Sequence, residues 1–466
     1  APVDSPEFKE FIRKNSYWLA DFALFNTLKF LQQGNGWFDW EENYRVRGHA
    51  SLVKVRNEHN EYILFNKWVQ WQLHKQFEKV KDYAVKKNVL LKGDLPILVS
   101  RDSADVWAHP EYFKLDFSAG APPDMYCAKG QRWGTPTYNW ESIFSDGGKY
   151  LKEKLKYAEN FYDILRVDHV VGLFRIWSIP QDDPRENLGL NGVFDPIDER
   201  CWEEHGRRIL TFMLDNTNML LCAEDLGVIP PVCPKVLKEL GIPGNEVQRW
   251  VKDWKCRHDF LLPGEYREPA VAMLSTHDTT NWPAWWENEA GTIDEALFIR
   301  KCADRGINFS AAKEKLFDKE LSRHGRLRWL NEINSVDALV YILGKRNEEV
   351  GDFMDLYKNS YGEKEKLWKL FGFGGRMKEK FVPPIVRAAL EYVLNCSSIF
   401  VINLLLDWMY FGDKFKGNPY TYRYNFPGTI SDKNWSLRLP FSLEELLDFD
   451  RNKDILAMVE KAGRAL

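Results

Sequence analysis

The sequence predicts an α/β fold whose parallel strands alternate with helices, and a (β/α)8 TIM barrel is the architecture that we expect. Apolar runs of strand length alternate with amphipathic segments of helical period, which is typical of βαβ units. Three of these runs end in an acidic residue, and barrel enzymes carry their functional residues at the carboxyl ends of the strands. A chain of 466 residues has room for one elaborated barrel or for two domains.

Six buried strands are predicted, near residues 90, 164, 220, 248, 273 and 400. The first carries Asp94 at its end, and the last is the apolar run 397–406, which is followed by Asp407. A closed (β/α)8 barrel needs eight strands. The acidic strand ends therefore agree with a barrel, whereas the number of strands falls two short of it.

Helical segments divide the chain into four predicted parts. Residues 1–87 carry apolar side chains at three- and four-residue spacing, which predicts a helical subdomain inserted in the barrel. Residues 88–291 are the predicted catalytic barrel core, and residues 292–395 are a helical, charged insertion. The last barrel strand and a C-terminal segment occupy residues 396–466.

A long loop at residues 100–140 is rich in Pro, Gly, Asp and Trp. Long loops inside compact domains are usually functional or disordered, and so many aromatic residues argue against disorder. We expect a lid that binds substrate over the rim of the barrel. A packed surface loop is the alternative.

The composition favours a neutral or small polar substrate. The net charge is -4 and the isoelectric point is about 6.2, so the sequence carries no electrostatic signal for nucleic acid or for an acidic membrane. The chain contains 19 Trp and 19 Tyr, and their flat amphipathic rings can stack on sugar faces or simply fill the core.

The cysteines and the lack of a long apolar run predict a soluble cytoplasmic protein. Seven Cys are scattered without CxxC pairs, which indicates buried free thiols rather than disulfides or a zinc site. No apolar run approaches the roughly 18 to 20 residues that span a bilayer. The first residues also lack a signal segment.

Two acidic residues could share glycoside chemistry. Arg166 and Asp168 lie two positions apart, so a strand directs both side chains to one face, and the guanidinium should keep the carboxylate ionised. Glu224 follows the apolar run Leu-Leu-Cys-Ala, whose desolvation should raise its pKa. Retaining glycoside transfer or hydrolysis needs one ionised and one protonated carboxyl group about 5 to 5.5 Å apart. Acidic residues in ordinary strand-to-helix loops are the alternative.

The third acidic strand end is Asp278, which follows His277. Together they could form hydrogen bonds with ring hydroxyls as the sugar distorts towards the transition state. Competing chemistries are weaker: Asp94, Asp102 and Asp105 do not have calcium-loop spacing, and no HxxxH, Walker or G-x-S-x-G pattern is present. We therefore expect no metal and no cofactor.

Eight stretches in chain order resemble the α-amylase clan and, more narrowly, the family-77 4-α-glucanotransferases, which include amylomaltase and the plant disproportionating enzymes. They are residues 93–97 (GDLPI), 102–107 (DSADVW), 122–124 (PPD), 130–138 (GQRWGTPTY), 166–169 (RVDH), 223–227 (AEDLG), 276–278 (THD) and 425–429 (NFPGT), the last followed by Asn434 and Trp435. The versions at 120–124, 136–140 and 172–177 are most similar to the cytosolic plant-type disproportionating enzyme and its microbial relatives.

The resemblance implies a (β/α)8 barrel of the α-amylase clan that moves an α-1,4-glucan segment from donor to acceptor through a covalent glycosyl-enzyme. It implies that Asp168 is the nucleophile, Glu224 the acid/base and Asp278 the transition-state-stabilising aspartate. It also implies sugar contacts, from Arg166 and His277 near the cleavage point and from Asp124, Trp133 and Tyr138 in or beside the lid. The rival functions are an α-glucan hydrolase and a non-catalytic glucan-binding protein.

The sequence departs from the family pattern in two places. Thr279 stands where members usually have Asn after the His-Asp pair. The family also opens with two βα units before the helical stretch at residues 5–33, and these units are missing here. We therefore expect a barrel without its first two βα units, with an upstream segment or carbohydrate-binding modules outside this chain.

Overall fold

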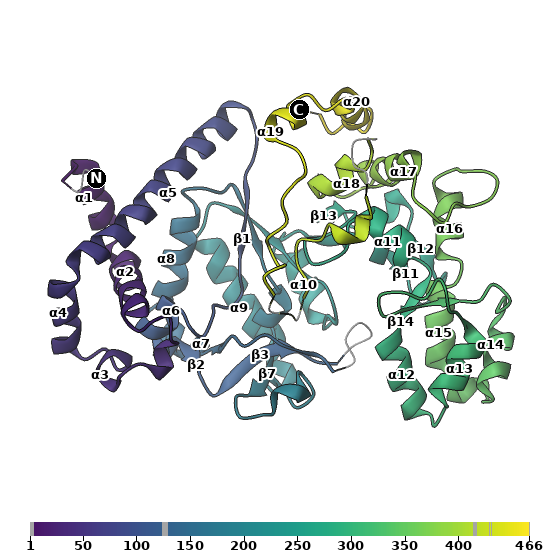
Figure 1. The fold of residues 1–466 in the computed structure, drawn as a ribbon, viewed down its shortest axis with the longest axis horizontal. Coiled ribbons are helices and arrows are strands. Elements are labelled where there is room, and N and C mark those ends of the chain that lie inside the picture. The colour runs from purple at the N-terminus through teal and green to yellow at the C-terminus, as the bar shows by residue number, and fades with distance from the viewer. Residues whose placement is uncertain (1–3, 124–128, 413–416, 428, 430, 466) are drawn as a thin grey trace. The chain divides into compact units, whose positions relative to one another are not determined.

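The computed structural model describes residues 4–123, 129–412, 417–427, 429 and 431–465 (Figure 1). The chain forms two compact units. The first comprises Ala1–Pro122 and Gly130–Ile242, and the second comprises Pro123–Lys129 and Pro243–Leu466. Each unit contains a three-stranded parallel sheet, so each is described by itself below.

The first unit opens with the helices that the sequence predicts. They are α1 (Pro6–Lys14), α2 (Ser16–Leu31), α3 (Glu42–Arg45), α4 (His49–Glu58) and α5 (Asn60–Lys86). The Ser5 hydroxyl accepts the Phe8 N–H and so caps the start of α1. Helix α2 packs along α5, and the two bury Leu24, Leu28 and Ile63 in one apolar cluster.

The parallel sheet of the first unit has the order β1 (Lys92–Leu95), β6 (Ile164–Val167), β9 (Leu220–Ala223). Asp94 pairs with Arg166 across the first ladder, and Val167 pairs with Ala223 across the second. Helices α8 (Lys149–Ala158) and α9 (Trp202–Asp215) precede β6 and β9 and pack with them in one core. Because the three strands are parallel, their carboxyl ends lie at the same edge of the sheet.

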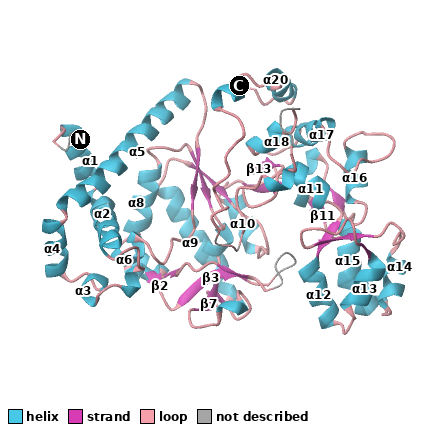
Figure 2. Ribbon diagram, in the orientation of Figure 1, coloured by secondary structure: helices cyan, strands magenta, loops and turns pink. Residues whose placement is uncertain are grey.

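The predicted long loop at 100–140 contains secondary structure that the sequence did not reveal. It includes α6 (Ala104–Ala108), β2 (Phe113–Lys114), β3 (Phe117–Ala121), β4 (Gln131–Arg132) and β5 (Thr137–Tyr138). Strand β3 joins β4, β7 (Ile176–Pro180) and β8 (Val193–Asp195) in an antiparallel sheet, and Figure 2 shows β3 beside β7. Strands of two to five residues are too short for a periodic pattern to be recognised.

The second unit has a parallel sheet of the order β10 (Gly244–Val247), β13 (Ala270–Met273), β17 (Phe400–Val401). Together the two units place a parallel strand at all six predicted positions. The last strand was predicted too long. It ends at Val401, and Asp407 lies inside the helix α18 (Leu405–Met409), because an apolar run alone does not distinguish a buried strand from a short buried helix.

The predicted helical insertion contains α12 (Glu295–Asp304), α13 (Phe309–Leu316), α14 (Val336–Leu343), α15 (Gly351–Ser360), α16 (Glu363–Leu370) and α17 (Pro383–Leu394). It also holds an antiparallel sheet of the order β14 (Thr292–Asp294), β16 (Arg326–Trp329), β15 (Phe317–Asp318). This sheet was not predicted. Helices α12 to α15 pack on it around Phe298, Leu327 and Phe353.

No disulfide joins the cysteines in the part of the chain that the structure describes. Cys222, Cys233, Cys302 and Cys396 are buried as predicted, whereas the prediction is wrong for Cys201 and Cys256, which are exposed. Cys127 lies outside the described residues. Both exposed cysteines sit in polar segments, where no apolar face draws the side chain inside.

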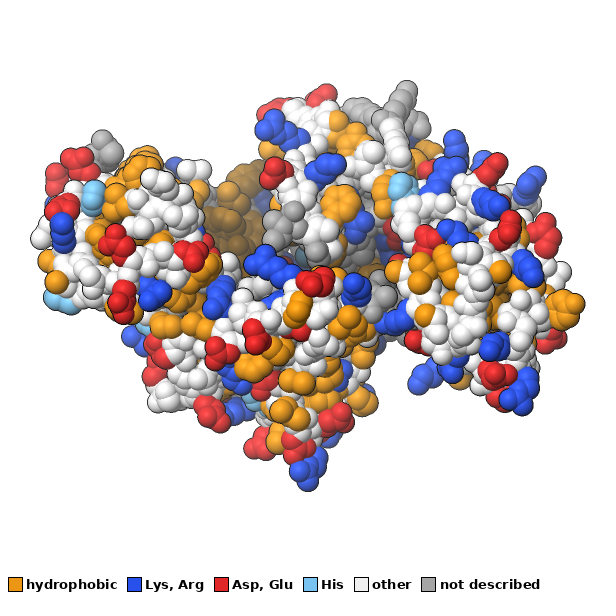
Figure 3. Space-filling model, turned by 60° about the horizontal axis from the view of Figure 1, so that its bottom comes forward, with side chains coloured by type: hydrophobic (Ala, Val, Ile, Leu, Met, Phe, Trp, Pro, Cys, Tyr) orange, Lys and Arg blue, Asp and Glu red, His pale blue; other side chains and the backbone are white. Residues whose placement is uncertain are grey.

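The surface carries both signs of charge, with acidic and basic side chains interspersed on the face shown in Figure 3. Within the described residues, no helix combines the length and the apolar character needed to cross a membrane.

We predict that Gly206→Ala destabilises the first unit. Gly206 lies in α9, and an added Cβ would stand 2.3 Å from Cδ1 of the buried Phe174 ring. Overpacking of this kind costs about 1 to 3 kcal/mol, which exceeds the roughly 1 kcal/mol that alanine gains in helix propensity. Urea unfolding should therefore show a net loss on the order of 1 kcal/mol.

The matched control is Gly351→Ala at the start of α15, where the added Cβ would have no atom within 4 Å. That variant should be as stable as the parent or slightly more stable. If both variants unfold at the parent's urea concentration, the close packing of α9 against Phe174 is not a constraint on the fold.

Candidate active site

The ends of β6 and β9 bring Asp168 and Glu224 next to each other in the first unit. The Asp168 N–H donates to the Leu95 carbonyl (3.1 Å), and the Glu224 N–H donates to the Val167 carbonyl (3.0 Å). These bonds continue the two parallel ladders by one residue beyond the strands. Asp168 and Glu224 therefore occupy equivalent positions at adjacent strand ends, where barrel enzymes carry their functional groups.

Arg166 forms ion pairs with two carboxylates. Its Nη1 lies 2.8 Å from Asp94 Oδ1 and 2.7 Å from Asp168 Oδ1. The parallel register explains the pairing with Asp94, because Asp94 and Arg166 are cross-strand partners on one face of the sheet. The two-residue spacing explains the pairing with Asp168. The Arg166 guanidinium is thus fixed between two carboxylates and supplies positive charge directly at the Asp168 side chain.

Glu224 has a strongly raised pKa. Burial raises it to about 7, the nearby Asp168 adds to the increase, and Arg166 opposes it. Two backbone amides also oppose it, because Oε2 accepts the His169 N–H (2.9 Å) and Oε1 accepts the Leu226 N–H (3.0 Å). A carboxyl group with a pKa near 7 can give up a proton in one step and take it back in the next at neutral pH.

His169 connects the acid to the predicted lid. Its backbone adopts a left-handed conformation (φ 40°), which directs its N–H to Glu224. Its ring meets the Trp133 ring edge-on at 4.9 Å between centroids. Burial lowers the pKa of His169 to about 4, so the imidazole is neutral at pH 7. The sequence did not predict this role for His169, because a hydrophobic pattern does not reveal a residue with a left-handed backbone.

The other predicted lid residues lie elsewhere or are not described. Tyr138 lies among Phe113, Trp140 and Tyr150, and burial raises the pKa of its hydroxyl well above the usual range. The structure therefore places Tyr138 in an aromatic cluster of the first unit. Asp124 lies outside the described residues. Sugar contacts from both remain predictions.

The second unit holds Asp278 in the loop that follows β13. Asn425 Nδ2 donates to Asp278 Oδ1 (2.7 Å), and His277 Nε2 lies 3.2 Å from Asp278 Oδ2. Arg423 Nη2 donates to the backbone carbonyl of Asp278 (3.1 Å). Both Asp278 carboxylate oxygens thus have a polar neighbour, and Asn425 comes from the stretch near the C-terminus whose resemblance to the family was noted above.

Thr279 stabilises the same loop through its hydroxyl group. Its hydroxyl accepts the Thr276 N–H (3.0 Å) and donates to the Thr276 carbonyl (3.1 Å), which closes a short turn around His277 and Asp278. The amide contact on the Asp278 carboxylate comes from Asn425.

Arg249 supports the Asp278 loop from a buried position. Its Nη2 donates to Ser275 Oγ (2.7 Å) and to the Thr280 carbonyl (2.9 Å), on either side of His277 and Asp278. Sequence reasoning missed Arg249, because an arginine in the run 246–251 gave no signal that it would be buried beneath a neighbouring loop.

The described residues contain no group of three or more His, Cys, Asp or Glu side chains arranged to hold a metal ion. The strand ends carry carboxyl groups. In the first unit, these are Asp168 beside Arg166 and the partly protonated Glu224.

Comparisons with known proteins agree on one family. The sequence profile of the glycoside hydrolase family 77, described as 4-alpha-glucanotransferase, matches residues 2–444. The 4-alpha-glucanotransferase of Chlamydia caviae is 30% identical over 449 residues, covering 95% of this chain and 68% of that protein. The 4-alpha-glucanotransferase of Thermus thermophilus is 31% identical over 326 residues, covering 67% of this chain and 62% of that protein.

Two solved structures share the fold. The amylomaltase from Streptococcus agalactiae in complex with acarbose matches with a TM-score of 0.68 and 21% identity, covering 98% of this chain and 73% of that one. The amylomaltase from Corynebacterium glutamicum matches with a TM-score of 0.64 and 19% identity, covering 98% and 56%. The predicted TIM-barrel type of α/β fold is confirmed, and the chain belongs to the glycoside hydrolase 77 family of 4-α-glucanotransferases.

Proposed function

We propose that this chain transfers α-1,4-glucan segments from a donor to an acceptor by a retaining double displacement. The observation that supports this mechanism is the pair of carboxyl groups at adjacent strand ends of the first unit. Asp168 lies in an ion pair with Arg166, and Glu224 has a pKa of about 7. A retaining mechanism needs this division of roles between two carboxyl groups.

In the first step, Asp168 attacks the anomeric carbon of the donor and the bond to the glycosidic oxygen breaks. Glu224 gives its proton to that oxygen, so the shortened donor leaves as an alcohol. The product of the step is a glycosyl ester of Asp168.

In the second step, the hydroxyl of the acceptor glucan loses its proton to Glu224 and attacks the same anomeric carbon. The ester bond breaks and Asp168 is released as a carboxylate. Two inversions give net retention. A pKa near 7 suits both steps, because Glu224 must be an acid in the first and a base in the second.

We assign substrate positioning to the remaining site residues. Asp278, held by Asn425 and His277, would accept hydrogen bonds from ring hydroxyls that strengthen in the transition state. Arg166 and Trp133 are further proposed contacts of the sugar. Asp124 and Tyr138 remain proposed contacts on the acceptor side.

We also propose the substrates, the family subgroup and the cellular compartment of the reaction. Maltooligosaccharides are the proposed substrates, with starch or glycogen chains as natural donors. The versions of the motifs at 120–124, 136–140 and 172–177 support a place near the cytosolic plant-type enzymes. Free thiols at Cys201 and Cys256 suit a reducing cytoplasm.

Incubation with maltotriose tests the reaction type. Transfer predicts a ladder of longer maltooligosaccharides, visible by chromatography, whereas hydrolysis predicts glucose and maltose alone. Asp168→Asn should lower the rate by about a thousandfold or more, because it removes the nucleophile on which both steps depend. An unchanged rate in that folded variant would remove Asp168 from the mechanism.

The pH profile tests the role of Glu224. The first step needs the protonated acid, so kcat/KM for the donor should be level below the pKa and fall about tenfold per pH unit above about 7. The profile should be measured with maltotriose at constant ionic strength. A level profile up to pH 9 would mean that Glu224 does not donate the proton.

A donor with a leaving group that needs no proton separates the two carboxyl groups. Glu224→Ala should lose activity on maltotriose but keep glycosylation by α-maltosyl fluoride, since fluoride leaves without acid assistance. Asp168→Ala should lose both. The control is Glu239→Ala, which removes a surface glutamate at the end of α10 (Val232–Glu239) and should keep both activities. Equal losses on both donors in Glu224→Ala would contradict the assignment.

A further inference from the structure

The loop at residues 274–281 joins β13 to α11 (Trp282–Asn288) and carries Asp278. Its first residue is fixed from another segment, because the Leu274 N–H donates to Asn403 Oδ1 (2.9 Å). Asp278 lies near the middle of the loop. The direction of its carboxylate therefore depends on where the two ends of the loop are held.

Arg249 connects the two ends of this loop from a buried position. In addition to its bonds with Ser275 and the Thr280 carbonyl, its Nη1 donates to Thr280 Oγ1 (3.2 Å) and its Nη2 donates to the Leu274 carbonyl (3.3 Å). Only 2% of the Arg249 surface is exposed. Burial of a charge is costly unless an opposite charge lies nearby, so Arg249 needs an acidic neighbour.

Asp407 in α18 is such a neighbour. It has no exposed surface, and its Oδ1 accepts the N–H of Trp282, the first residue of α11 (2.7 Å). Burial raises the pKa of Asp407 to about 6, whereas the Trp282 N–H, Arg249 and the Ser275 hydroxyl oppose the increase. The carboxyl group is therefore mostly ionised at pH 7, and it places a negative charge near Arg249.

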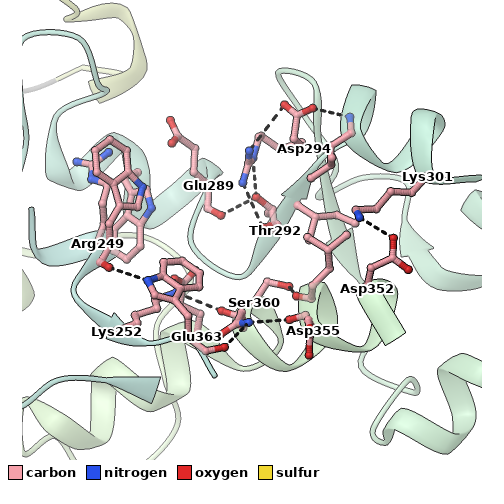
Figure 4. Close-up of a pocket in the computed structure, with 18 of the residues that line it drawn as sticks. Arg249, Lys252, Glu289, Thr292, Asp294, Lys301, Asp352, Asp355, Ser360 and Glu363 are labelled. Carbon is pink, nitrogen blue, oxygen red and sulfur yellow. Dashed lines mark hydrogen bonds and ion pairs between the residues drawn. The ribbon is translucent and has the colours of Figure 1, made fainter. Parts of the chain in front are cut away.

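Glu289 is a second acidic residue near Arg249, but it is only half-buried. Its Oε1 accepts the Thr280 hydroxyl (2.7 Å). Glu289 and Arg249 both line a pocket of about 410 Å³ in the second unit, where Figure 4 shows them, whereas Asp407 does not line this pocket. Solvent can screen the charge of Glu289, while Asp407 is enclosed by protein. The charge of Asp407 therefore acts on Arg249 with less screening.

Stability alone does not explain this buried pair. Desolvation of two charges largely offsets their attraction, and apolar side chains of similar volume are often at least as stabilising. Apolar side chains could not bond to the backbone of the loop. Arg249 binds the Leu274 and Thr280 carbonyls, and Asp407 binds the Trp282 N–H. The pair therefore fixes the orientation of the loop in a way that apolar packing could not.

We propose that Asp407 is a positioning residue for the glucan transfer. Its carboxylate holds Arg249 and the Trp282 N–H, and through both it fixes the loop that presents the Asp278 carboxylate. The inference rests on the proposed function, in which Asp278 forms hydrogen bonds that strengthen in the transition state. A displaced Asp278 would weaken binding of the transition state more than binding of the substrate, so the effect falls on kcat rather than on KM.

Asp407→Asn tests the proposal, because it removes the charge but keeps the size of the side chain and an oxygen for the Trp282 N–H. With maltotriose as the donor, kcat should fall about tenfold or more, and KM should change by about twofold or less. The decrease of kcat/KM above about pH 7 should remain, because it belongs to Glu224. A folded Asp407→Asn variant with the kcat of the parent would overturn the proposal.

A double-mutant comparison shows whether Asp407 acts through Asp278. Asp278→Ala should lower kcat, and adding Asp407→Asn to it should cause no further loss, because the group that Asp407 positions is already absent. The donor is α-maltosyl fluoride, whose reactive leaving group keeps the residual rate measurable. If the two losses multiply, Asp407 acts on the rate independently of Asp278 and the proposal is wrong.

Glu379→Gln is the matched control for the loss of a buried counter-charge. The Lys364 side chain in α16 is only 1% exposed, and Glu379 Oε2 lies 2.5 Å from its Nζ. This variant removes the acidic partner of another buried base in the second unit, so its melting temperature should fall while its kcat stays at the value of the parent. An equal loss of kcat in Glu379→Gln would mean that a general loosening of the second unit lowers activity, which would overturn the role of Asp407.

The same measurements separate this inference from the proposed function. The proposed function fails if the parent makes no maltooligosaccharide ladder, and the proposed role of Asp278 fails if Asp278→Ala keeps the kcat of the parent. The inference about Asp407 fails by itself if the parent and Asp278→Ala behave as expected while Asp407→Asn keeps full kcat. Melting curves should show that each variant is folded at the temperature of the assay.

Discussion

The Arg166 guanidinium lies between Asp94 and Asp168, and the chemistry of the first unit depends on this arrangement. It links β1 to the end of β6 and places a positive charge where two carboxylates would otherwise repel each other. The same charge opposes the rise in the pKa of Glu224, which burial and Asp168 together produce. Because these effects oppose one another, Glu224 titrates near neutral pH instead of remaining fully protonated or fully ionised.

A comparable constraint holds Asp278 in the second unit. Asn425 and His277 approach its carboxylate, while Arg249 bonds to the residues on both sides of the loop from a buried position. Glu289 supports the same loop, because its carboxylate accepts a hydrogen bond from the Thr280 hydroxyl. The loop that presents the third acidic residue is therefore supported by side chains from other segments.

The long-range periodic features of the fold could be predicted, and the short or irregular ones could not. The six parallel strands lie where apolar runs predicted them, and four of them, β6, β9, β10 and β13, are mostly buried. The antiparallel sheet around β3 was not predicted, because strands of two to five residues have too few positions to show an alternating pattern. The last strand was predicted too long, because an apolar run alone does not distinguish a buried strand from a short buried helix: the strand ends at Val401, and α18 begins at Leu405.

The sequence by itself determined which residues could carry the chemistry: the spacing of Arg166 and Asp168, the apolar run before Glu224 and the His277–Asp278 pair are all local features. Only the tertiary structure decided how those groups behave. The hydrogen bond from the His169 amide to Glu224 and the bond from the Asn425 side chain to Asp278 each join residues from different segments. Burial, and the partners brought together by folding, set the pKa and the orientation of a side chain, and no local pattern contains that information.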